Sequence, residues 1–247
     1  MINEWIVDIN CDVGEGINNE SKLMPYISSC NIACGGHAGD LDTMRTVVKL
    51  AKEYQVKIGA HPSFPDKENF GRQIIDMSCA DLYTSLRQQI RDLMVVLREE
   101  HLTLHHIKLH GALYNLAAID EKTANVVIEV VKSIAFPVYL YAPYKSVLAD
   151  IAKKEHIAVT YEAFADRNYN DDLTLVSRTK NSPIIERADL VFEHVHRMIF
   201  KKKVKTIDGV EVGIKADTFC IHGDHPEAVK LVEGLTKKLK DHHVLIR

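Results

Sequence analysis

The sequence lacks the segments that would place it in or beyond a membrane. It has no stretch of about 18 uncharged apolar residues, which a membrane-spanning helix needs. Its first residues, MINEWIVDINCD, do not show the basic region followed by an apolar run that marks a secretory signal. We therefore expect a soluble, cytoplasmic protein with no membrane partner.

Positive charge and paired cysteines are also scarce. The 31 Lys and Arg residues are outnumbered by 34 Asp and Glu residues, for a net charge of -3. A nucleic-acid surface needs a local excess of positive charge, so we expect no nucleic-acid partner. The five cysteines show no C-x-x-C spacing, which indicates buried reduced thiols rather than disulfides or a zinc knuckle.

The common nucleotide-binding loops are missing too. Neither G-x-G-x-x-G nor G-x-x-x-x-G-K-[ST] occurs, and the first strand candidate runs instead into DVGEG, whose acidic residue is unsuited to phosphate. An open doubly wound sheet, which usually carries such a loop, is therefore the less favoured architecture. No linker, low-complexity tract or internal repeat divides the chain, so we expect a single domain over residues 1–247.

What the sequence does contain is an alternation of short β-rich runs and longer helical patterns. The strand candidates are residues 5–10, 31–34, 57–61, 107–110, 138–141, 158–162 and 218–222. Between them, apolar residues recur at helical spacing, and Asp40 and Ser78 are placed to cap two of the helices. Repeated βα units predict a parallel sheet with helices outside. Seven or eight strands of this kind can close into one α/β barrel.

Polar residues occupy one face of the first strand candidate. Asp8, Asn10 and Asp12 alternate with apolar residues, so their side chains share a face. Three buried polar groups are costly unless they hydrogen-bond one another or bind something, which favours a polar ladder in the barrel lumen with Asp12 nearest the mouth. The alternative is an edge strand with one face in water.

Polar residues also stand where other apolar strands end. These strand-end residues are His61, His110, Glu162 and His222, and His37 follows the second strand. The carboxyl ends of barrel strands carry the active site, so we expect these side chains to meet there. Glycines in CGGHAGD and HGD allow a close backbone approach, and we expect Gly35 and Gly36 to turn the chain so that His37 leans over the mouth.

Several cations accompany these residues. Lys108 is in phase with His110, where its ammonium could stabilise an oxyanion or a substrate carboxylate, or pair with a lumenal carboxylate such as Asp8. The guanidiniums of Arg72, Arg167 and Arg178 lie in loops, where they suit either carboxylate or phosphate recognition or a surface position.

Taken together, six segments of the chain resemble the LamB/YcsF family. They are DINCDVGEG, NIACGGHAGD, GAHPSFPD with FGR, KLHGALYN, EAFADRNY and HGD, in this order from Asp8 to Asp224. The resemblance implies a distorted (β/α) barrel similar to that of polysaccharide deacetylases. It also implies ATP-dependent opening of 5-oxoproline, a cyclic lactam, to L-glutamate with two partner subunits, PxpB and PxpC. Phosphorylation of the lactam oxygen would turn a poor electrophile into a better one.

The positions of the polar residues at strand ends and the resemblance to the LamB/YcsF family together define the site that we expect. Asp12 or His61 is expected to act as general base, and His110 or His222 as the acid toward the leaving nitrogen. Lys108 completes the expected catalytic set by stabilising the oxyanion. The expected substrate-binding residues are Asp8, Asn10, His37, Arg72, Tyr114, Asn115, Glu162, Asp166, Arg167 and Asp224.

Two other functions stay open at this point. A divalent metal held by Asp12, His37 and His61 would make the protein a metal-dependent hydrolase or deacetylase acting on a carbohydrate or another amide, although no H-E-x-x-H motif supports it. A non-catalytic barrel that holds the lactam for its partners is the second. The sequence also leaves a homo-oligomer open.

Overall fold

A closed parallel barrel of seven strands forms the centre of the protein. The computed structural model describes residues 5–180 and 182–247. The barrel strands are β1 (Trp5–Val13), β2 (Ser29–Ala33), β3 (Lys57–His61), β4 (His106–Lys108), β5 (Tyr139–Pro143), β6 (Val159–Phe164) and β9 (Thr218–Ile221). They pair in the order β1-β2-β3-β4-β5-β6-β9, and β1 pairs with β9 to close the ring. The predicted single α/β barrel is confirmed.

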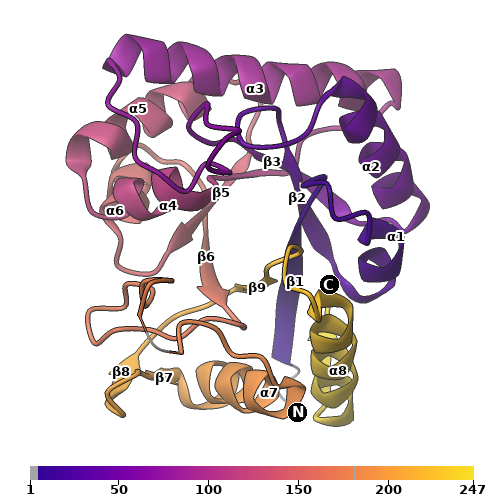
Figure 1. The fold of residues 1–247 in the computed structure, drawn as a ribbon, viewed down its shortest axis with the longest axis vertical. Helices are drawn as coiled ribbons and strands as arrows, with labels where there is room; N and C mark the ends of the chain where they lie inside the picture. The colour runs from indigo at the N-terminus through magenta and orange to yellow at the C-terminus, as the bar shows by residue number, and fades with distance from the viewer. Residues whose placement is uncertain (1–4, 181) are drawn as a thin grey trace.

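Helices surround the barrel, as Figure 1 shows. The longer ones are α2 (Leu41–Glu53), α3 (Cys79–Glu99), α5 (Glu121–Lys132), α6 (Val147–Lys154), α7 (Ala188–His196) and α8 (Ala228–Asp241). Shorter pieces are α1 (Glu20–Leu23), the 3-10 turn Met24–Tyr26, α4 (Gly111–Ala117) and the π-helical turn Arg197–Lys201. None of the helices in the described ranges is both long enough and apolar enough to cross a membrane.

The helix starts follow the predicted capping chemistry. The Asp40 carboxylate accepts a hydrogen bond of 2.8 Å from the Thr43 backbone N–H at the start of α2. The Ser78 hydroxyl accepts one of 3.1 Å from the Asp81 backbone N–H at the start of α3. Each cap satisfies an N–H group that the helix itself leaves unpaired, so both predictions are confirmed.

Three short strands were not predicted. β7 (Lys203–Lys205) and β8 (Glu211–Gly213) form an antiparallel hairpin, and β10 (Val244–Ile246) pairs with the start of β1. The run Lys201–Lys203 is exposed, as expected for a solvated segment, but its last residue begins β7. β7 and β8 each contain a single buried or half-buried residue, which is too little for a recognisable alternation of apolar and polar side chains.

The predicted polar ladder lines the lumen. β1 lies between β2 and β9, so the alternative of an edge strand is wrong. At the amino end of the barrel, the Asp8 carboxylate accepts a hydrogen bond of 2.6 Å from the Ser29 hydroxyl. One layer higher, the Asn10 amide donates to Glu162 Oε1 at 3.0 Å. The polar interior is therefore cross-linked between strands, which holds the top layer of side chains in place.

Candidate active site

A cavity of about 630 Å³ opens at the carboxyl ends of the barrel strands. Its walls come from the strand ends and from the segment 172–179 that follows β6. The predicted residues that line it are Asp12, His61, Arg72, Lys108, His110, Tyr114, Asn115, Glu162, Arg167, His222 and Asp224. All five residues expected to be catalytic are therefore brought together at one mouth, as the positions at strand ends predicted.

Four residues expected to bind substrate do not line this cavity. Asp8 lies at the opposite end of the barrel, where Ser29 and Thr218 occupy its carboxylate. Asn10 is fully buried beneath the cavity floor. His37 is also buried, behind the lining residues, and Asp166 is covered by His222. The structure therefore places these four side chains outside the cavity lining.

Lys108 is the ionic centre of the cavity floor. Its ammonium lies 2.8 Å from Asp12 Oδ1, 3.1 Å from Glu162 Oε1 and 2.9 Å from Cys220 Sγ. The ammonium donates hydrogen bonds to Asp12 Oδ1, Cys220 Sγ and, at 3.4 Å, Asn10 Oδ1, and Glu162 adds a second negative charge beside it. The expected salt bridge to a lumenal carboxylate is therefore present, but its partners are Asp12 and Glu162 rather than Asp8.

The charges of this centre stabilise one another. Burial would lower the pKa of Lys108, but Asp12, Cys220 and Glu162 outweigh it and hold that pKa well above its usual value. Burial would likewise raise the pKa of Asp12, but His61 and Lys108 hold that pKa well below its usual range. Asp12 is therefore a carboxylate, and its Oδ2 lies 3.4 Å from His61 Nε2.

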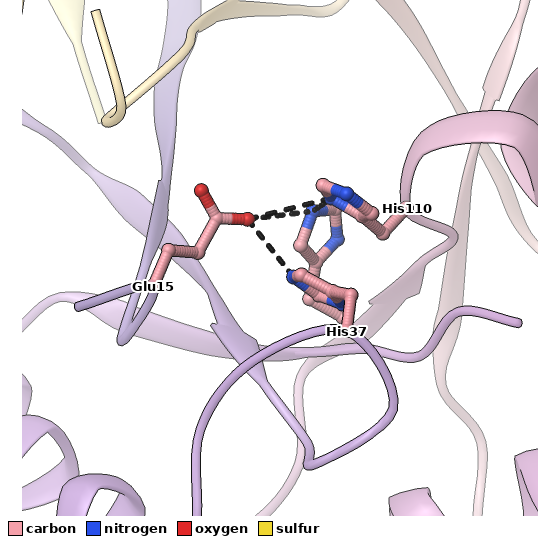
Figure 2. Close-up of side chains that lie close together, drawn as sticks. Glu15, His37 and His110 are labelled. Atoms are coloured by element: carbon pink, nitrogen blue, oxygen red, sulfur yellow. Dashed lines mark hydrogen bonds and ion pairs between the residues drawn. The ribbon is translucent and has the colours of Figure 1, made fainter. Parts of the chain in front are cut away.

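A second group, which we call the His–Glu cluster, consists of Glu15, His37, His61 and His110. Each residue offers one ligand-type atom, and the four atoms lie within 4.8 Å of one another. Figure 2 shows the Glu15 carboxylate pointing at the rings of His37 and His110, at 3.0 and 3.4 Å from their nearest nitrogens. Two to three imidazoles and a carboxylate are donors that suit a transition-metal ion.

The environment disfavours charge on three members of the cluster, Glu15, His37 and His110. Burial, followed by the negative charge of Asp12, raises the pKa of Glu15 to about 8. Burial, followed by the positive charge of His61, lowers the pKa of His37 to about 2. The same two causes hold the pKa of His110 well below its usual value, so His37 and His110 are neutral imidazoles at neutral pH.

Glu15 is the site residue that sequence reasoning missed. It follows β1 between Gly14 and Gly16, which adopt φ angles of +74° and +85°. These left-handed positions break the alternation of the strand and bring the Glu15 side chain back over the lumen. The sequence signal for Glu15 is the GEG triplet, which is assessed above only as a candidate phosphate loop.

His37 is placed by the turn after β2. Gly35 and Gly39 make this turn with φ angles of +92° and +80°. Gly36, which we expected to share this role, is instead needed for space, because a Cβ atom there would lie 2.4 Å from both Ser63 Oγ and Gln89 Oε1. The turn brings His37 onto the barrel mouth, where its ring stacks on His110 with centroids 3.6 Å apart.

On the other side of the mouth, His222 is oriented by Asp166. His222 Nδ1 lies 3.0 Å from the Asp166 carboxylate, which also accepts a hydrogen bond of 3.0 Å from the His222 backbone N–H. Burial would raise the pKa of Asp166, but His222 outweighs it and holds that pKa below its usual value. An ionised Asp166 fixes the hydrogen on Nδ1, which leaves Nε2 of His222 to exchange a proton at the cavity.

The arginines at the cavity differ in whether their guanidinium groups already have a partner. Arg72 forms an ion pair with Asp224 that joins the loops after β3 and β9. The Arg167 guanidinium donates to the backbone carbonyls of Val176 and Pro183, which holds the segment after β6 in place. Arg178 lines the cavity, is exposed, and has no ion-pair partner within the described ranges. Of these three arginines, Arg178 is thus the one available for an anionic ligand.

Two buried polar atoms at the cavity wall have no hydrogen-bond partner among the described residues. They are the Tyr114 hydroxyl and Glu162 Oε2. The hydroxyl is a hydrogen-bond donor because burial, followed by the charge of Glu162, raises the pKa of Tyr114 well above its usual value. A hydrogen-bonding contribution from Glu162 to this pKa shows that the hydroxyl and the carboxylate are neighbours, although they form no well-aligned hydrogen bond. Buried polar groups that are not fully paired are costly, so this donor and acceptor indicate a place for a polar ligand.

Comparison with known proteins gives one consistent family. The LamB/YcsF family profile matches residues 7–247. The A subunit of 5-oxoprolinase from Shouchella clausii is 42% identical over 246 residues, which cover 98% of this chain and 97% of that protein. Its counterpart of the same name from Histophilus somni is 38% identical over 240 residues and 97% of each chain. The crystal structure of a lactam utilization protein from Thermus thermophilus matches with a TM-score of 0.92 and 34% identity over 98% of each chain. The chain belongs to the LamB/YcsF family.

Proposed function

We propose that this chain is the barrel subunit of an ATP-dependent 5-oxoprolinase, which opens 5-oxo-L-proline to L-glutamate in the cytoplasm. The observation that carries this proposal is the full-length similarity to proteins named as the A subunit of 5-oxoprolinase. The resemblance in the sequence motifs further leads us to propose PxpB and PxpC as partner subunits and ATP as the co-substrate of the complex. The cavity of this chain supports the proposal because proton-transfer groups and free polar groups gather at one mouth of the barrel.

The free polar groups suit the functional groups of 5-oxoproline. A lactam presents one N–H and one C=O, and the partnerless Glu162 Oε2 and Tyr114 hydroxyl supply an acceptor and a donor. The substrate also carries a carboxylate, for which the unpaired Arg178 is the available cation. Recognition of the lactam by Glu162, Tyr114 and Arg178 would use groups that have no competing partner among the described residues.

Ring opening needs a proton removed from water and a proton delivered to the leaving nitrogen. We assign the first to Asp12 Oδ2, which Lys108 keeps ionised and which lies 3.4 Å from His61 Nε2. When His61 is neutral, both atoms are acceptors and can hold the two hydrogens of one water molecule. We assign the second to His222 Nε2, because the pairing of Nδ1 with the Asp166 carboxylate leaves Nε2 as the ring nitrogen that can carry a proton to the cavity.

The proposed requirement for ATP follows from the low reactivity of the lactam carbonyl carbon. The carbon of an unactivated lactam reacts slowly with water, whereas phosphorylation of the lactam oxygen creates a good leaving group and a far more electrophilic carbon. With such an intermediate, the strongly held Asp12 carboxylate is a sufficient base despite its lowered pKa. Attack by one water molecule and departure of the ring nitrogen, which takes up a proton, give γ-glutamyl phosphate. A second water molecule then displaces phosphate and gives glutamate.

We expect the isolated chain to release no glutamate from 5-oxoproline above background, with or without ATP. The complex reconstituted with PxpB and PxpC should release glutamate only when ATP is present. The measurement is glutamate formation over time for the chain alone, the two partners alone and the three together. Equal activity of the partners without this chain, or ATP-dependent turnover by the isolated chain, would contradict the proposed division of labour.

A further inference from the structure

We propose that the His–Glu cluster binds one divalent transition-metal cation through His61 Nε2, His110 Nδ1 and the Glu15 carboxylate. The distances between these atoms, and the partners that fix their hydrogens, support a metal site whichever substrate the protein uses. It replaces the metal set suggested by the sequence, which was Asp12, His37 and His61.

The backbone fixes where two of the imidazoles carry their hydrogens. His61 Nδ1 lies 2.8 Å from the Lys108 carbonyl oxygen, and His110 Nε2 lies 2.9 Å from the Phe70 carbonyl oxygen. A carbonyl oxygen can only accept, so these two nitrogens carry the hydrogens. With both rings neutral, His61 Nε2 and His110 Nδ1 have bare lone pairs, and a further proton on His61 would take the place on Nε2 that a cation can occupy. These bare nitrogens face each other at 3.0 Å.

Carboxylate oxygens surround the same two nitrogens. Glu15 Oε1 lies 3.4 Å from His110 Nδ1 and 3.9 Å from His61 Nε2. Asp12 Oδ2 lies 3.4 Å from His61 Nε2. Four acceptor atoms thus converge on one buried point. One cation at this point can contact the two nitrogens and the carboxylate oxygens together, whereas a proton bridges only two atoms at a time.

The spacing of the donor atoms suits such an ion. Metal–nitrogen and metal–oxygen bonds of 2.0–2.1 Å in a tetrahedral site place neighbouring donor atoms about 3.3 Å apart. The nitrogens of His61 and His110 are 3.0 Å apart, and Glu15 Oε1 is 3.4 and 3.9 Å from them. The backbone carbonyls behind both imidazoles are also the usual outer partners of histidine ligands, since they fix the ring orientation.

His37 is a supporting residue in this arrangement. Its ring is parallel to that of His110, with an interplanar angle of 2° and centroids 3.6 Å apart. The lone pair of an imidazole nitrogen lies in the ring plane, so one ion cannot lie in the planes of two stacked rings. His37 Nε2 lies 3.0 Å from Glu15 Oε1 and can instead donate a hydrogen bond to this ligand oxygen. His37 would therefore orient Glu15 rather than bind the metal.

The donor set points to the chemical class of the ion. Two imidazole nitrogens with a carboxylate suit Zn²⁺ and its first-row neighbours, whereas Mg²⁺ and Ca²⁺ prefer oxygen ligands throughout. The cluster adjoins the cavity through Glu15, His61 and His110, so a bound ion would have an open side toward a ligand. At that position it would lower the pKa of a bound water molecule beside Asp12.

The test is direct binding to the full chain after removal of metals with a chelator. We expect calorimetric titration with ZnCl₂ to show one ion per chain, and CoCl₂ to give the visible absorption of a low-symmetry Co²⁺ site. His61→Ala and His110→Ala should abolish both signals. Glu15→Gln, which keeps the shape of the side chain, and His37→Ala should weaken binding by about 10–100-fold.

His242→Ala provides the matched control, because His242 is an exposed histidine at the end of α8. It should bind Zn²⁺ like the unaltered chain, and circular dichroism should show that all variants fold. Absence of specific binding, or an affinity in folded Glu15→Gln and His110→Ala equal to that of the unaltered chain, would overturn the proposal. The acceptors would then be bridged by protons alone.

Discussion

Lys108→Met is expected to lower the free energy of unfolding by about 3–5 kcal/mol, because it leaves buried carboxylates without their cation. Lys108 is 1% exposed and forms ion pairs with Asp12 and Glu162, which are 4% and 2% exposed. Methionine keeps the length and much of the volume of lysine, so little of the loss should come from a cavity. Denaturant unfolding followed by circular dichroism measures the change.

Two further variants test whether the loss of the Lys108 ion pairs causes this loss of stability. Lys240→Met, at an exposed position of α8, should change the stability by less than about 0.5 kcal/mol. Adding Asp12→Asn to Lys108→Met removes one unpaired charge, so the double variant should lose less stability than the sum of the single changes. A Lys108→Met protein as stable as the unaltered chain would show that the ion pairs do not hold the barrel floor.

His222→Ala is expected to lower kcat of the reconstituted complex by about 10²–10⁴-fold, since it removes the proposed acid for the leaving nitrogen. The side chain lies at the rim of the cavity and is 16% exposed, so the melting temperature should change little. KM for 5-oxoproline should also change little, because recognition is assigned to Glu162, Tyr114 and Arg178. Steady-state kinetics with saturating ATP provide both parameters.

Asp166→Asn should reproduce part of this loss, because the amide cannot stabilise an imidazolium at His222. It should also shift the pH dependence of kcat, an effect that a purely structural role would not produce. The control is His225→Asn, three residues further along, which retains an acceptor for the Glu227 backbone N–H. Normal kcat in His222→Ala, or an equal loss in His225→Asn, would remove His222 from the proposed mechanism.

The barrel could be predicted because each strand carries its own local signal. All seven barrel strands match predicted runs, with β3 at Lys57–His61 placed to the residue. Apolar runs that end in a polar residue identify both the strand and its carboxyl end, where the site lies. Glu162 is the exception, since β6 continues to Phe164 and places this carboxylate one layer deeper than expected.

The parts of the site that escaped prediction depend on geometry that no local pattern encodes. Glu15 reaches the lumen only through the positive φ angles of the two glycines beside it. Asp166 and His222 meet because β6 and β9 become neighbours in the barrel, although 56 positions separate them. Asp8 shares a face with Asp12 but lies near the other end of the lumen, because four residues of a strand span about 13 Å.

The most direct test of the central claim, that this barrel mouth is where the lactam is opened, is kcat of the complex containing His61→Ala at saturating 5-oxoproline. His61 lies beside the proposed base at 3.4 Å and within the His–Glu cluster, so its loss should impair the chemical step itself. We predict a fall in kcat of at least about 100-fold in a complex that still assembles. An unchanged kcat with only a raised KM would contradict the account and make this chain a module that holds the lactam for its partners.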